Sequence, residues 1–599
     1  MSTSVDDELR KGVAAHQVGD LTAAAASYVR VLEFAPAHAD AQHLLGLVYA
    51  QTGQGRRGAE LIRAAIAADA TVPLYHANLG RVLKGDGDYQ DAANAYLAAI
   101  ALSPDDAVLW SDLASARLSG NDPEGAVKAA KHALSLESAL AAAHVNLGLA
   151  RQDLDGASDT AAMAALARAA ALDPGQAGAH LGLALGYHAA GTTAQAREAY
   201  KRSLAIDPSL IVAHCNLGNL ERDASEFDAA VMHYRHALAL DDNQPVVHGN
   251  LAVALQESGN LAGALMVYEK AVALAPHDPE IRRNRGMGLL AVGRFKEGWA
   301  DYEYRWQTSR FQALGRTFDV PKWDGIVVAG LRLWVHAEQG FGDTLQFCRF
   351  IPILKAQGVQ VTFECADPLH ALMQSVGANA VIAPGEVPSV DAHVPLMSLP
   401  GHLGTGADSI PAQVPYLRPP ADRIRAWQEI MAAWPVGKRI GISWKGAPSH
   451  QRDARRSPGL GPFLALLDTP DVVLVSLQKD GGTLDIQNTL GAEAVLDPTE
   501  DIHDFADTAA IMQGLDAVIS CDSAPLHLAG ALGCRAFAVL PHVAEWRWGE
   551  GGKDTPWYPS MTLLRQPKPG DWNSCFQTLI GLLKAPSSGL SPILGEKLR

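Results

Sequence analysis

The first half of the chain alternates apolar and polar residues with a helical period, interrupted by small residues at a fixed interval. The interval is 34 residues, with one step of 36 before Ala184, and the markers are Gly12, Gly46, Gly80, Ala114, Gly148, Ala184, Gly218, Ala252 and Gly286. A second small residue follows each marker by 12 residues, or by 14 in the longer repeat, at Ala24, Gly58, Ala92, Ala126, Ala162, Ala196, Ala230, Ala264 and Gly298. Such a period is typical of stacked helical hairpins. The pattern therefore predicts nine hairpins ending near Trp306.

Prolines mark the ends of several of these repeats, where they stop the second helix of a hairpin. They are Pro36, Pro104, Pro174, Pro208 and Pro276. Spacing and residue types together resemble the tetratricopeptide repeat family. This resemblance implies an α-solenoid over residues 1–306 whose concave surface binds a protein or peptide partner.

A row of amide side chains accompanies the markers. Two residues before a marker stand Asn78, Asn146, Asn216, Asn250 and Asn284, with Asp112 as a variant. An amide both donates and accepts hydrogen bonds, so it can bind the backbone of an extended partner segment without recognising that segment's side chains. The row resembles the asparagine ladder of repeat-bearing O-linked N-acetylglucosamine transferases, which implies binding of an acceptor protein. Hydrogen bonding between neighbouring repeats is the alternative.

From Leu331 the pattern changes to short apolar runs alternating with amphipathic segments, which predicts an α/β class. Strands are expected at 331–337, 359–365, 439–444, 472–477, 516–520 and 536–540, with helices at about 343–357 and 525–532. They form two open parallel sheets beside a cleft, with ligands beyond the carboxyl ends of the strands. The predicted organisation is a repeat array (1–306), a linker (307–330), a first Rossmann-like lobe (331–420), a second Rossmann-like lobe (421–585) and a tail (586–599). The Pro-rich stretch 411–420 is the expected connection between the lobes.

The stretch DAVISCDSAPLHLAGALGC (516–534) predicts a strand, an abrupt turn and a helix. Free backbone N–H groups and the positive end of the helix dipole suit an anion at such a turn. The stretch resembles the heptosyltransferase-type glycosyltransferases, and Asp522, Ser523 and His527 match position by position. The resemblance implies that these three residues bind a nucleotide-sugar donor in the second lobe. Helix capping by Asp522 or Ser523, with His527 packed inside, is the alternative.

A second motif, EQGFGDTLQF (338–347), follows the first predicted strand, and Gly340 and Gly342 allow a tight turn into a helix. It resembles the same family's Gly-x-Gly-Asp segment, which implies that Asp343 is the catalytic base. Sugar transfer to a hydroxyl needs a group that removes the acceptor proton. Since Asp is also a favoured helix cap, a capping role is the alternative, and Glu338 is the reserve base.

Further donor contacts are expected around the second lobe's first two strands. Lys445 in SWKG, which the resemblance also covers, can stabilise a leaving phosphate. Gln478 is a candidate nucleotide contact, and Arg455 and Arg456 are possible donor-phosphate residues or part of a solvated loop. The aromatic stretch 546–548 borders the donor site or packs at the hinge. Without a convincing Asp-x-Asp motif, we expect no metal and no cofactor, the nucleotide sugar being a substrate.

The composition of the 599-residue chain indicates which partners and which cellular compartment to expect. Its net charge is −16, which disfavours nucleic acid and anionic membranes as partners. The six cysteines form no CxxC pair, as expected for reduced thiols without a zinc site. The start MSTSVDDELR is polar and acidic, and no apolar run is long enough to span a membrane. We expect a cytoplasmic protein.

An α-solenoid followed by two Rossmann-like lobes of the GT-B type resembles the bacterial bidomain glycosyltransferases that modify flagellin. The resemblance implies a metal-independent protein O-glycosyltransferase whose array holds the acceptor, with flagellin the first candidate. A CMP-linked nonulosonic acid and a UDP-linked hexosamine both remain open as donor. The alternatives are a transferase acting on lipopolysaccharide or another surface glycan, and a scaffold that binds a nucleotide sugar without turnover.

Overall fold

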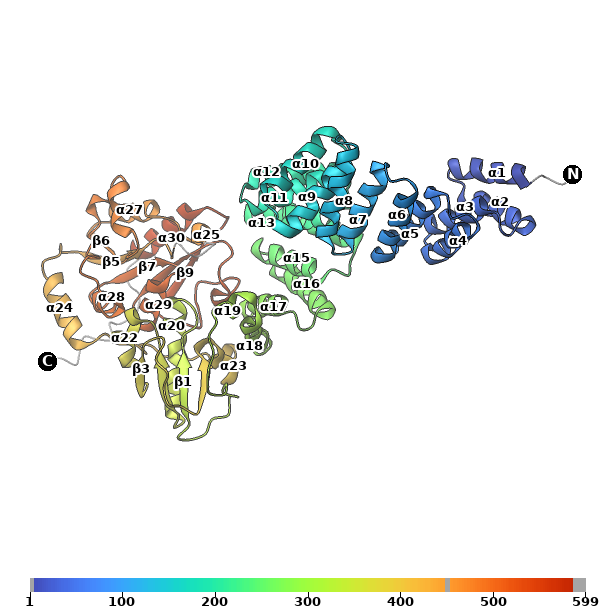
Figure 1. Cartoon of the computed structure of the whole chain (residues 1–599). Coiled ribbons are helices and arrows are strands. Elements are labelled where there is room, and N and C mark those ends of the chain that lie inside the picture. Colours follow the sequence, from blue (N-terminus) through green and yellow to red (C-terminus); the bar gives the residue numbers. More distant parts are fainter. Residues whose placement is uncertain (1–4, 448–452, 585–599) are drawn as a thin grey trace. The chain divides into compact units, whose positions relative to one another are not determined.

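The computed structural model describes residues 5–447 and 453–584 and is shown in Figure 1. The chain divides into two compact units, residues 1–242 and residues 243–599. The predicted tail, 586–599, lies outside the described residues.

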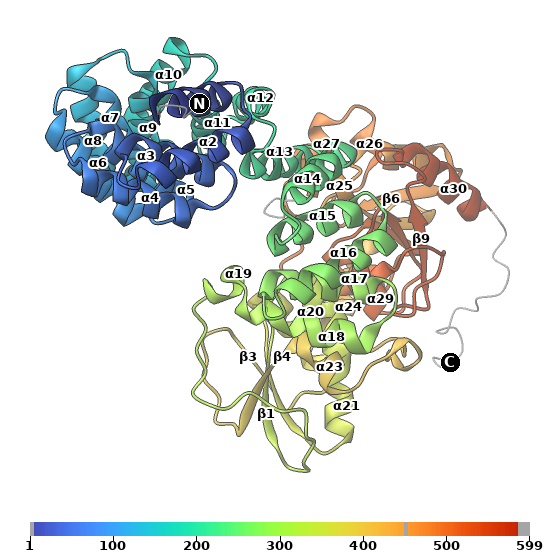
Figure 2. The ribbon, with the colours of Figure 1, turned by 90° about the vertical axis from the view of Figure 1, so that its right-hand side faces the viewer.

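The first unit consists of helical hairpins that stack in chain order, drawn in blue to green in Figures 1 and 2. Its described residues form fourteen helices: α1 (Val5–Gln17), α2 (Leu21–Phe34), α3 (Ala39–Gln51), α4 (Gly55–Ala68), α5 (Pro73–Gly85), α6 (Tyr89–Leu102), α7 (Ala107–Ser119), α8 (Pro123–Leu136), α9 (Ala141–Asp155), α10 (Thr160–Leu172), α11 (Ala177–Ala189), α12 (Thr193–Ile206), α13 (Ile211–Asp223) and α14 (Phe227–Leu240). The predicted hairpins are confirmed.

The small marker residues lie where the two helices of a hairpin cross, as predicted. All nine markers and all nine of their partners are buried. In the second repeat a Cβ placed on Gly46 would stand 2.7 Å from the carbonyl oxygen of Gly58, and one on Gly58 would stand 2.5 Å from that of Gly46. A larger residue at either position would push the helices apart.

A second repeated contact closes the turns between hairpins. Four residues before the marker, a side-chain N–H group faces the backbone carbonyl six residues upstream, as in Trp110 Nε1 to Pro104 O at 2.9 Å. The same contact is made by Gln42, His76, His144, His180, His214 and Arg282, at 2.7–3.2 Å. Because a helix end leaves backbone groups unpaired, these side chains stabilise each repeat boundary. The sequence carries this signal, and our sequence analysis missed it.

The second unit begins with two further hairpins, α15 (Pro245–Glu257) with α16 (Leu261–Leu274) and α17 (Pro279–Ala291) with α18 (Phe295–Tyr302). A 3-10 helix, η1 (Glu303–Gln307), and α19 (Ser309–Gln312) follow. Phe295, Trp299 and Tyr302 belong to the same hydrophobic core as the α/β part. The indole of Trp299 donates to the Thr405 carbonyl and lies edge-on to the rings of Phe347 and Trp546. The last hairpin is therefore built into the α/β part.

The first sheet is entirely parallel, with strand order β3-β2-β1-β4. Its elements are β1 (Arg332–His336), α20 (Phe341–Phe347), η2 (Cys348–Phe350), α21 (Ile351–Ala356), β2 (Gln360–Glu364), α22 (Asp367–Met373), η3 (Gln374–Val376), β3 (Ala380–Ile382), β4 (Ala392–Pro395), η4 (Leu396–Ser398), α23 (Leu399–His402) and η5 (Ala407–Ser409). The helix expected at 343–357 is interrupted by η2, just before Pro352 near the start of α21.

The second sheet is also parallel, with strand order β6-β5-β7-β8-β9. Its elements are α24 (Ala421–Met431), β5 (Lys438–Ser443), α25 (Asp453–Arg456), α26 (Gly461–Leu464), η6 (Ala465–Asp468), β6 (Val472–Ser476), α27 (Gly482–Asn488), η7 (Ala492–Ala494), α28 (Phe505–Met512), β7 (Ala517–Cys521), α29 (Ala524–Ala531), β8 (Ala536–Leu540), η8 (Trp546–Trp548), β9 (Met561–Arg565) and α30 (Trp572–Lys584). The predicted α/β class with two parallel sheets is confirmed. The sequence analysis did not predict the strands β3, β4 and β9.

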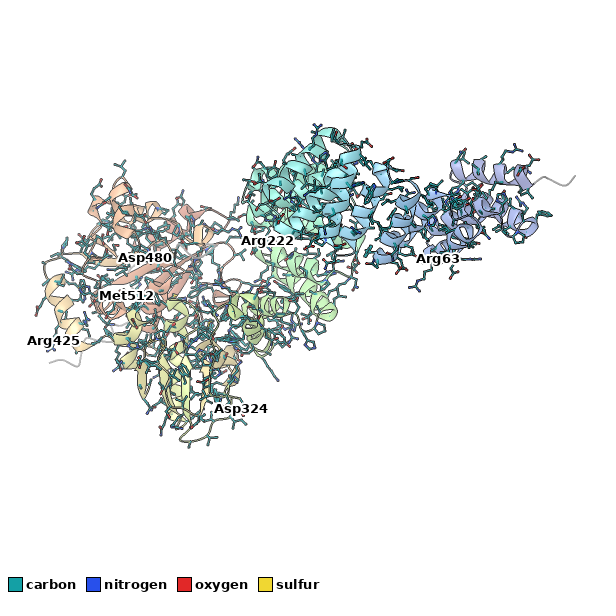
Figure 3. All side chains as sticks on the ribbon, viewed as in Figure 1. Arg63, Arg222, Asp324, Arg425, Asp480 and Met512 are labelled. Carbon is teal, nitrogen blue, oxygen red and sulfur yellow. The ribbon has the colours of Figure 1, made fainter. Side chains whose placement is uncertain are left out.

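The segment expected as a linker packs onto the first sheet. Arg316 donates to both carboxylate oxygens of Glu364 on β2, at 2.9 and 2.8 Å. The Phe318 ring stacks on His393 of β4 with centroids 3.8 Å apart. Asp324, labelled in Figure 3, accepts a hydrogen bond from the backbone of Ile326 and shapes the turn before β1. Residues 316–326 thus cover the sheet.

Candidate functional site

The order of strands fixes where a ligand would bind. In each sheet the order reverses once, between β1 and β4 in the first and between β5 and β7 in the second. Ligands of open parallel sheets bind outside the carboxyl ends of the strands at such reversals. Asp343 follows β1, Lys445 follows β5 and Asp522 follows β7. All three therefore lie at the edges where this fold binds ligands.

Asp343 lies in the first turn of α20 and faces the second sheet's lobe. Its Oδ1 accepts a hydrogen bond from Arg547 Nη2 at 2.6 Å, and its side chain is 19% exposed. Within the described residues its Oδ2 makes no hydrogen bond. The neighbouring Gly342 is closely packed, because a Cβ there would stand 2.8 Å from Cδ2 of His527. The two lobes thus meet at α20.

Asp522 and His527 form a buried pair at the end of β7 and in α29. Asp522 Oδ1 lies 3.6 Å from His527 Nε2, and the other ring nitrogen, Nδ1, lies 2.9 Å from the Tyr558 hydroxyl. The carboxylate favours a proton on Nε2, so Tyr558 donates to Nδ1. Ser523, the N-cap of α29, shares a hydrogen bond with Ser520 at 3.0 Å and does not cap the helix with its side chain.

Burial and charge act in opposite senses on this pair. Burial raises the pKa of Asp522, but His527, Arg547 and Trp548 outweigh it and hold that pKa well below its ordinary value. Burial lowers the pKa of His527, although Asp522 opposes the shift. At neutral pH the site therefore holds a carboxylate and a neutral imidazole.

Lys445 and Gln478 lie together at the ends of β5 and β6. Gln478 Oε1 accepts hydrogen bonds from the backbone N–H groups of Trp444 and Lys445, each at 3.1 Å. Lys445 Nζ pairs with Asp485 at 2.5 Å, and its side chain is 25% exposed. Gln478 is thus occupied in shaping the turn that carries Lys445, and the ammonium is positioned by Asp485.

The two candidate arginines have different partners. Arg456 pairs with Asp453 at 3.2 Å. Burial raises the pKa of the Cys521 thiol, next to Asp522, to about 12, and the charge of Arg456 opposes that shift. Arg455 pairs with Glu257 of α15 at 3.3 Å. Arg456 therefore lies near the Asp522 edge, whereas Arg455 is joined to the eighth hairpin.

The asparagines of the row make three different kinds of contact. Asn78 is buried and lies 2.8 Å from His43 of the preceding repeat, and Asn146 Nδ2 donates to the Ser111 carbonyl at 2.9 Å. Both amides thus bridge neighbouring repeats. Asn284 accepts from Arg283 at 2.9 Å. Asn216 and Asn250 make no side-chain hydrogen bond within the described residues, so their amides remain available to a partner.

Two arginines of this region, Arg305 and Arg349, escaped the sequence analysis because their partners are distant in the chain. The Glu338 carboxylate accepts from Arg305, 33 residues away, at 2.8 Å, and both side chains are buried. Burial raises the pKa of Glu338 to about 7, although Arg305 opposes the shift. Arg349 donates to the Trp557 carbonyl at 2.6 Å and to the Tyr416 hydroxyl at 2.9 Å, joining the two lobes.

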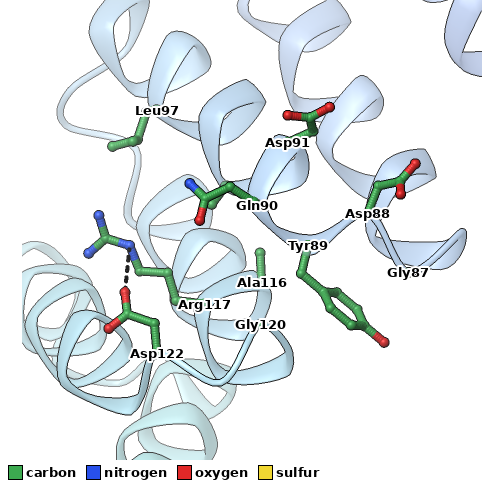
Figure 4. A pocket seen from close by; sticks show the side chains of 11 residues that line it. Gly87, Asp88, Tyr89, Gln90, Asp91, Leu97, Ala116, Arg117, Gly120 and Asp122 are labelled. Atoms are coloured by element: carbon green, nitrogen blue, oxygen red, sulfur yellow. Dashed lines mark ion pairs between the residues drawn. The ribbon is translucent and has the colours of Figure 1, made fainter.

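The described surface also has a hollow of about 430 Å³ on the first unit, lined by α6, α7 and the start of α8 (Figure 4). Its rim carries Asp88, Asp91 and Tyr89, and Arg117 pairs there with Asp122 at 3.7 Å. It holds none of the predicted site residues. Over residues 5–447 and 453–584, no group of three or more His, Cys, Asp or Glu residues is arranged to hold a metal ion. The same residues include no helix long and apolar enough to cross a membrane.

Family comparisons identify the repeats. Tetratricopeptide repeat models match residues 9–73, 77–140 and 221–285. Protein FlbA of Caulobacter vibrioides is 29% identical over 310 residues, covering 47% of this chain and 51% of FlbA. The BBSome complex member bbs-4 of Caenorhabditis elegans is 27% identical over 133 residues, covering 22% of this chain and 29% of that protein. The chain thus spans about half of FlbA's length and less of that of bbs-4.

Solved structures with similar helical arrays include the APC/C hetero-tetramer Cut9-Hcn1, with 17% identity, a TM-score of 0.38 and coverage of 48% of this chain and 56% of the other. Another is pilF of Pseudomonas aeruginosa, with 18% identity, a TM-score of 0.32 and coverage of 35% and 95%. The matched models and the hairpins α1–α18 show that the chain contains tetratricopeptide repeats, followed by an α/β region with two parallel sheets.

Proposed function

We propose that this protein is an O-glycosyltransferase that moves a sugar from a nucleotide-sugar donor to a Ser or Thr of an acceptor protein held by the repeats. One observation supports this most strongly. The ion pair between Asp343 and Arg547 brings a carboxylate at the reversal of the first sheet beside the Asp522 and His527 pair at the reversal of the second. One lobe thus offers a base and the other a donor site.

The roles follow from the chemistry of the transfer. Asp343 accepts the proton of the acceptor hydroxyl through Oδ2 while the hydroxyl oxygen bonds to the anomeric carbon. The bond between that carbon and the donor phosphate breaks, and Lys445 stabilises the charge of the departing phosphate. Asp522, Ser523 and His527 hold the donor, as the resemblance to heptosyltransferase-type enzymes implies, and Gln478 contacts its nucleotide. No step requires a metal.

In this proposal the repeats bind the acceptor protein. A surface of stacked hairpins suits an extended protein segment, and Asn216 and Asn250 have amides that make no side-chain hydrogen bond to any other described residue. Flagellin is the acceptor we propose, since the combination of repeats and two lobes resembles bidomain flagellin glycosyltransferases. The reaction would then take place in the cytoplasm, before the acceptor is exported.

The test is intact-mass spectrometry of flagellin from cells with the gene, without it, and with Asp343→Asn in its place. The proposal predicts that flagellin loses whole sugar units in the deletion strain and in the Asp343→Asn strain. An unchanged flagellin mass in the deletion strain would exclude flagellin. Full modification in the Asp343→Asn strain would remove Asp343 as the base and favour the scaffold alternative.

A further inference from the structure

One side chain of the second lobe reaches the carboxylate that we propose as the base. Arg547, in η8, donates from Nη2 to Oδ1 of Asp343 at 2.6 Å, and the two side chains are 11% and 19% exposed. The other oxygen of Asp343, Oδ2, makes no hydrogen bond to a described residue. The guanidinium therefore occupies one carboxylate oxygen and leaves the other to take a proton.

The guanidinium of Arg547 is itself held in place. Its Cζ lies 5.2 Å from the centre of the Trp546 ring, within the range of a cation–π contact. Trp546 is buried and lies edge-on to Trp557. The backbone of η8 is fixed as well, because Arg565 at the end of β9 donates to the Trp548 carbonyl. Arg547 thus presents its charge from a well-supported element.

The charge of Arg547 persists in this partly buried position. Burial lowers the pKa of Arg547, but nearby carboxylates, with Asp343 the strongest, outweigh burial and raise that pKa above its ordinary value. The side chain is therefore a cation at neutral pH. A hydrogen bond from a charged donor to a carboxylate is shorter and about twice as strong as a neutral one. The contact is therefore strong enough to set the orientation of the Asp343 carboxylate.

We propose that Arg547 is a positioning residue for Asp343, which acts through the base and makes no contact with the donor. The inference rests on the proposed function and adds how the base is held. The carboxylate comes from the first lobe and its partner from the second, so the base is oriented only where the two lobes meet. They meet closely there, because a Cβ added to Gly342 would stand 2.8 Å from His527.

The test is a double-mutant cycle on sugar transfer by the full-length protein to purified flagellin, followed by intact-mass spectrometry. The donor is whichever of CMP-linked nonulosonic acid and UDP-N-acetylglucosamine supports transfer by the wild type. Arg547→Ala should lower kcat by about 10²-fold, the cost of displacing a catalytic group by about 1 Å. The dissociation constant of the donor, measured by calorimetric titration, should stay unchanged.

The second half of the cycle separates positioning from a structural role. The double variant Asp343→Asn, Arg547→Ala should be no slower than Asp343→Asn alone, since Arg547 then has no base to position. A residue that only supported the fold would cause the same loss of kcat in both backgrounds. Guanidinium ion, added far below the concentrations that unfold proteins, should restore part of kcat to Arg547→Ala and none to Asp343→Asn.

A matched control and a second variant guard against a folding defect. Arg332→Ala removes an exposed ion pair with Asp391 at the opposite, amino end of β1, and it should leave kcat unchanged. Arg547→Lys keeps the charge but not the planar guanidinium. If Arg547→Ala does not fold, Arg547→Lys takes its place in the cycle, with a smaller loss of kcat that should likewise vanish in the Asp343→Asn background.

Two results contradict the positioning role and leave the proposed function standing. Weaker donor binding with an unchanged kcat in Arg547→Ala would make Arg547 a phosphate contact, through its buried Nε, which has no hydrogen-bond partner among the described residues. Equal losses of kcat in the wild-type and Asp343→Asn backgrounds would make its role purely structural. If the wild type transfers no sugar from either donor, the proposed function fails and the role of Arg547 fails with it.

Discussion

The repeat array and the two-lobed part are each stabilised by a different kind of internal contact. The hairpins of the array use the same two contacts repeatedly, small residues at the helix crossing and a side-chain N–H on a turn carbonyl. The two-lobed part depends on single buried charged contacts between distant segments, such as Arg305 with Glu338 and Arg547 with Asp343. A damaged repeat should therefore fail locally, whereas a damaged charged contact should weaken the whole α/β part.

The largest expected effect comes from Arg305→Met. Removing one member of a buried ion pair strands the other charge, here Glu338, which typically costs about 3–5 kcal/mol. Chemical unfolding followed by a probe of the second unit, such as its tryptophan fluorescence, measures the loss. The double variant Arg305→Met, Glu338→Gln should recover part of it. A loss below about 1 kcal/mol in the single variant would show that the pair does not support the second unit.

Gly46→Val tests how the repeat array is stabilised. Its Cβ would stand 2.7 Å from the Gly58 carbonyl oxygen and 2.7 Å from Ile62, and overpacking of this kind costs about 1–3 kcal/mol. Hydrogen exchange should show the loss in the second repeat and its neighbours alone. Gly85→Ala is the control, because nothing lies within 4 Å of the added Cβ. Loss of protection throughout the first unit would contradict nearest-neighbour stabilisation.

Acid should destabilise the second unit through a buried histidine. Nε2 of His336 lies 3.2 Å from Nδ1 of His393. Burial, together with the nearby Arg316 and His393, lowers the pKa of His336 to about 2. As the pH falls, His336 binds a proton in the unfolded chain at a higher pH than in the folded protein. The free energy of unfolding is therefore highest above pH 6.5 and decreases as the pH falls. Between pH 6.5 and 5 the loss should reach about 1.6 kcal/mol.

The control for this titration is His336→Gln, which removes the titrating group. The stability difference between wild type and variant, measured by urea unfolding, should narrow by the same amount over that pH range. A constant difference would show that His336 keeps an ordinary pKa. This comparison cancels the titration of Glu338 and of the other histidines, which both proteins share.

The smallest expected effect is at a single repeat boundary. His144→Phe keeps the ring but removes the N–H that faces the Ser138 carbonyl at 3.0 Å, which should cost about 1 kcal/mol. His76→Phe should behave alike, and the double variant should show the sum, because distant repeats do not interact. Thermal unfolding of the first unit measures both. A double-variant loss that clearly exceeds the sum would contradict independent boundaries.

The array was predictable because its determinants are local and repeated. Each marker and its partner lie 12 to 14 residues apart, so the sequence itself places them at the crossing of one hairpin. The strands β1, β5 and β7 were predictable for a similar reason, since each is a short apolar run followed by turn residues. These runs suffice to predict Asp343, Lys445 and Asp522 at the edges of the sheets.

What the sequence could not show depends on contacts between distant segments. Arg547 lies 204 residues from Asp343, and no local pattern links them. Arg316 and Phe318 looked like linker residues because their partners, Glu364 and His393, lie on strands that come later in the chain. The use of Asn78 and Asn146 between repeats also depends on stacking geometry that the 34-residue period alone does not fix.

The most direct test of the central claim is reconstitution with purified components. Full-length protein, purified flagellin and either CMP-linked nonulosonic acid or UDP-N-acetylglucosamine would be followed by intact-mass spectrometry, beside Asp343→Asn and Lys445→Ala. We predict mass increases in whole sugar units for the wild type and rates reduced by about 10²- to 10⁴-fold for Asp343→Asn. Transfer by Asp343→Asn at the wild-type rate, or no transfer by the wild type with either donor, would contradict the account.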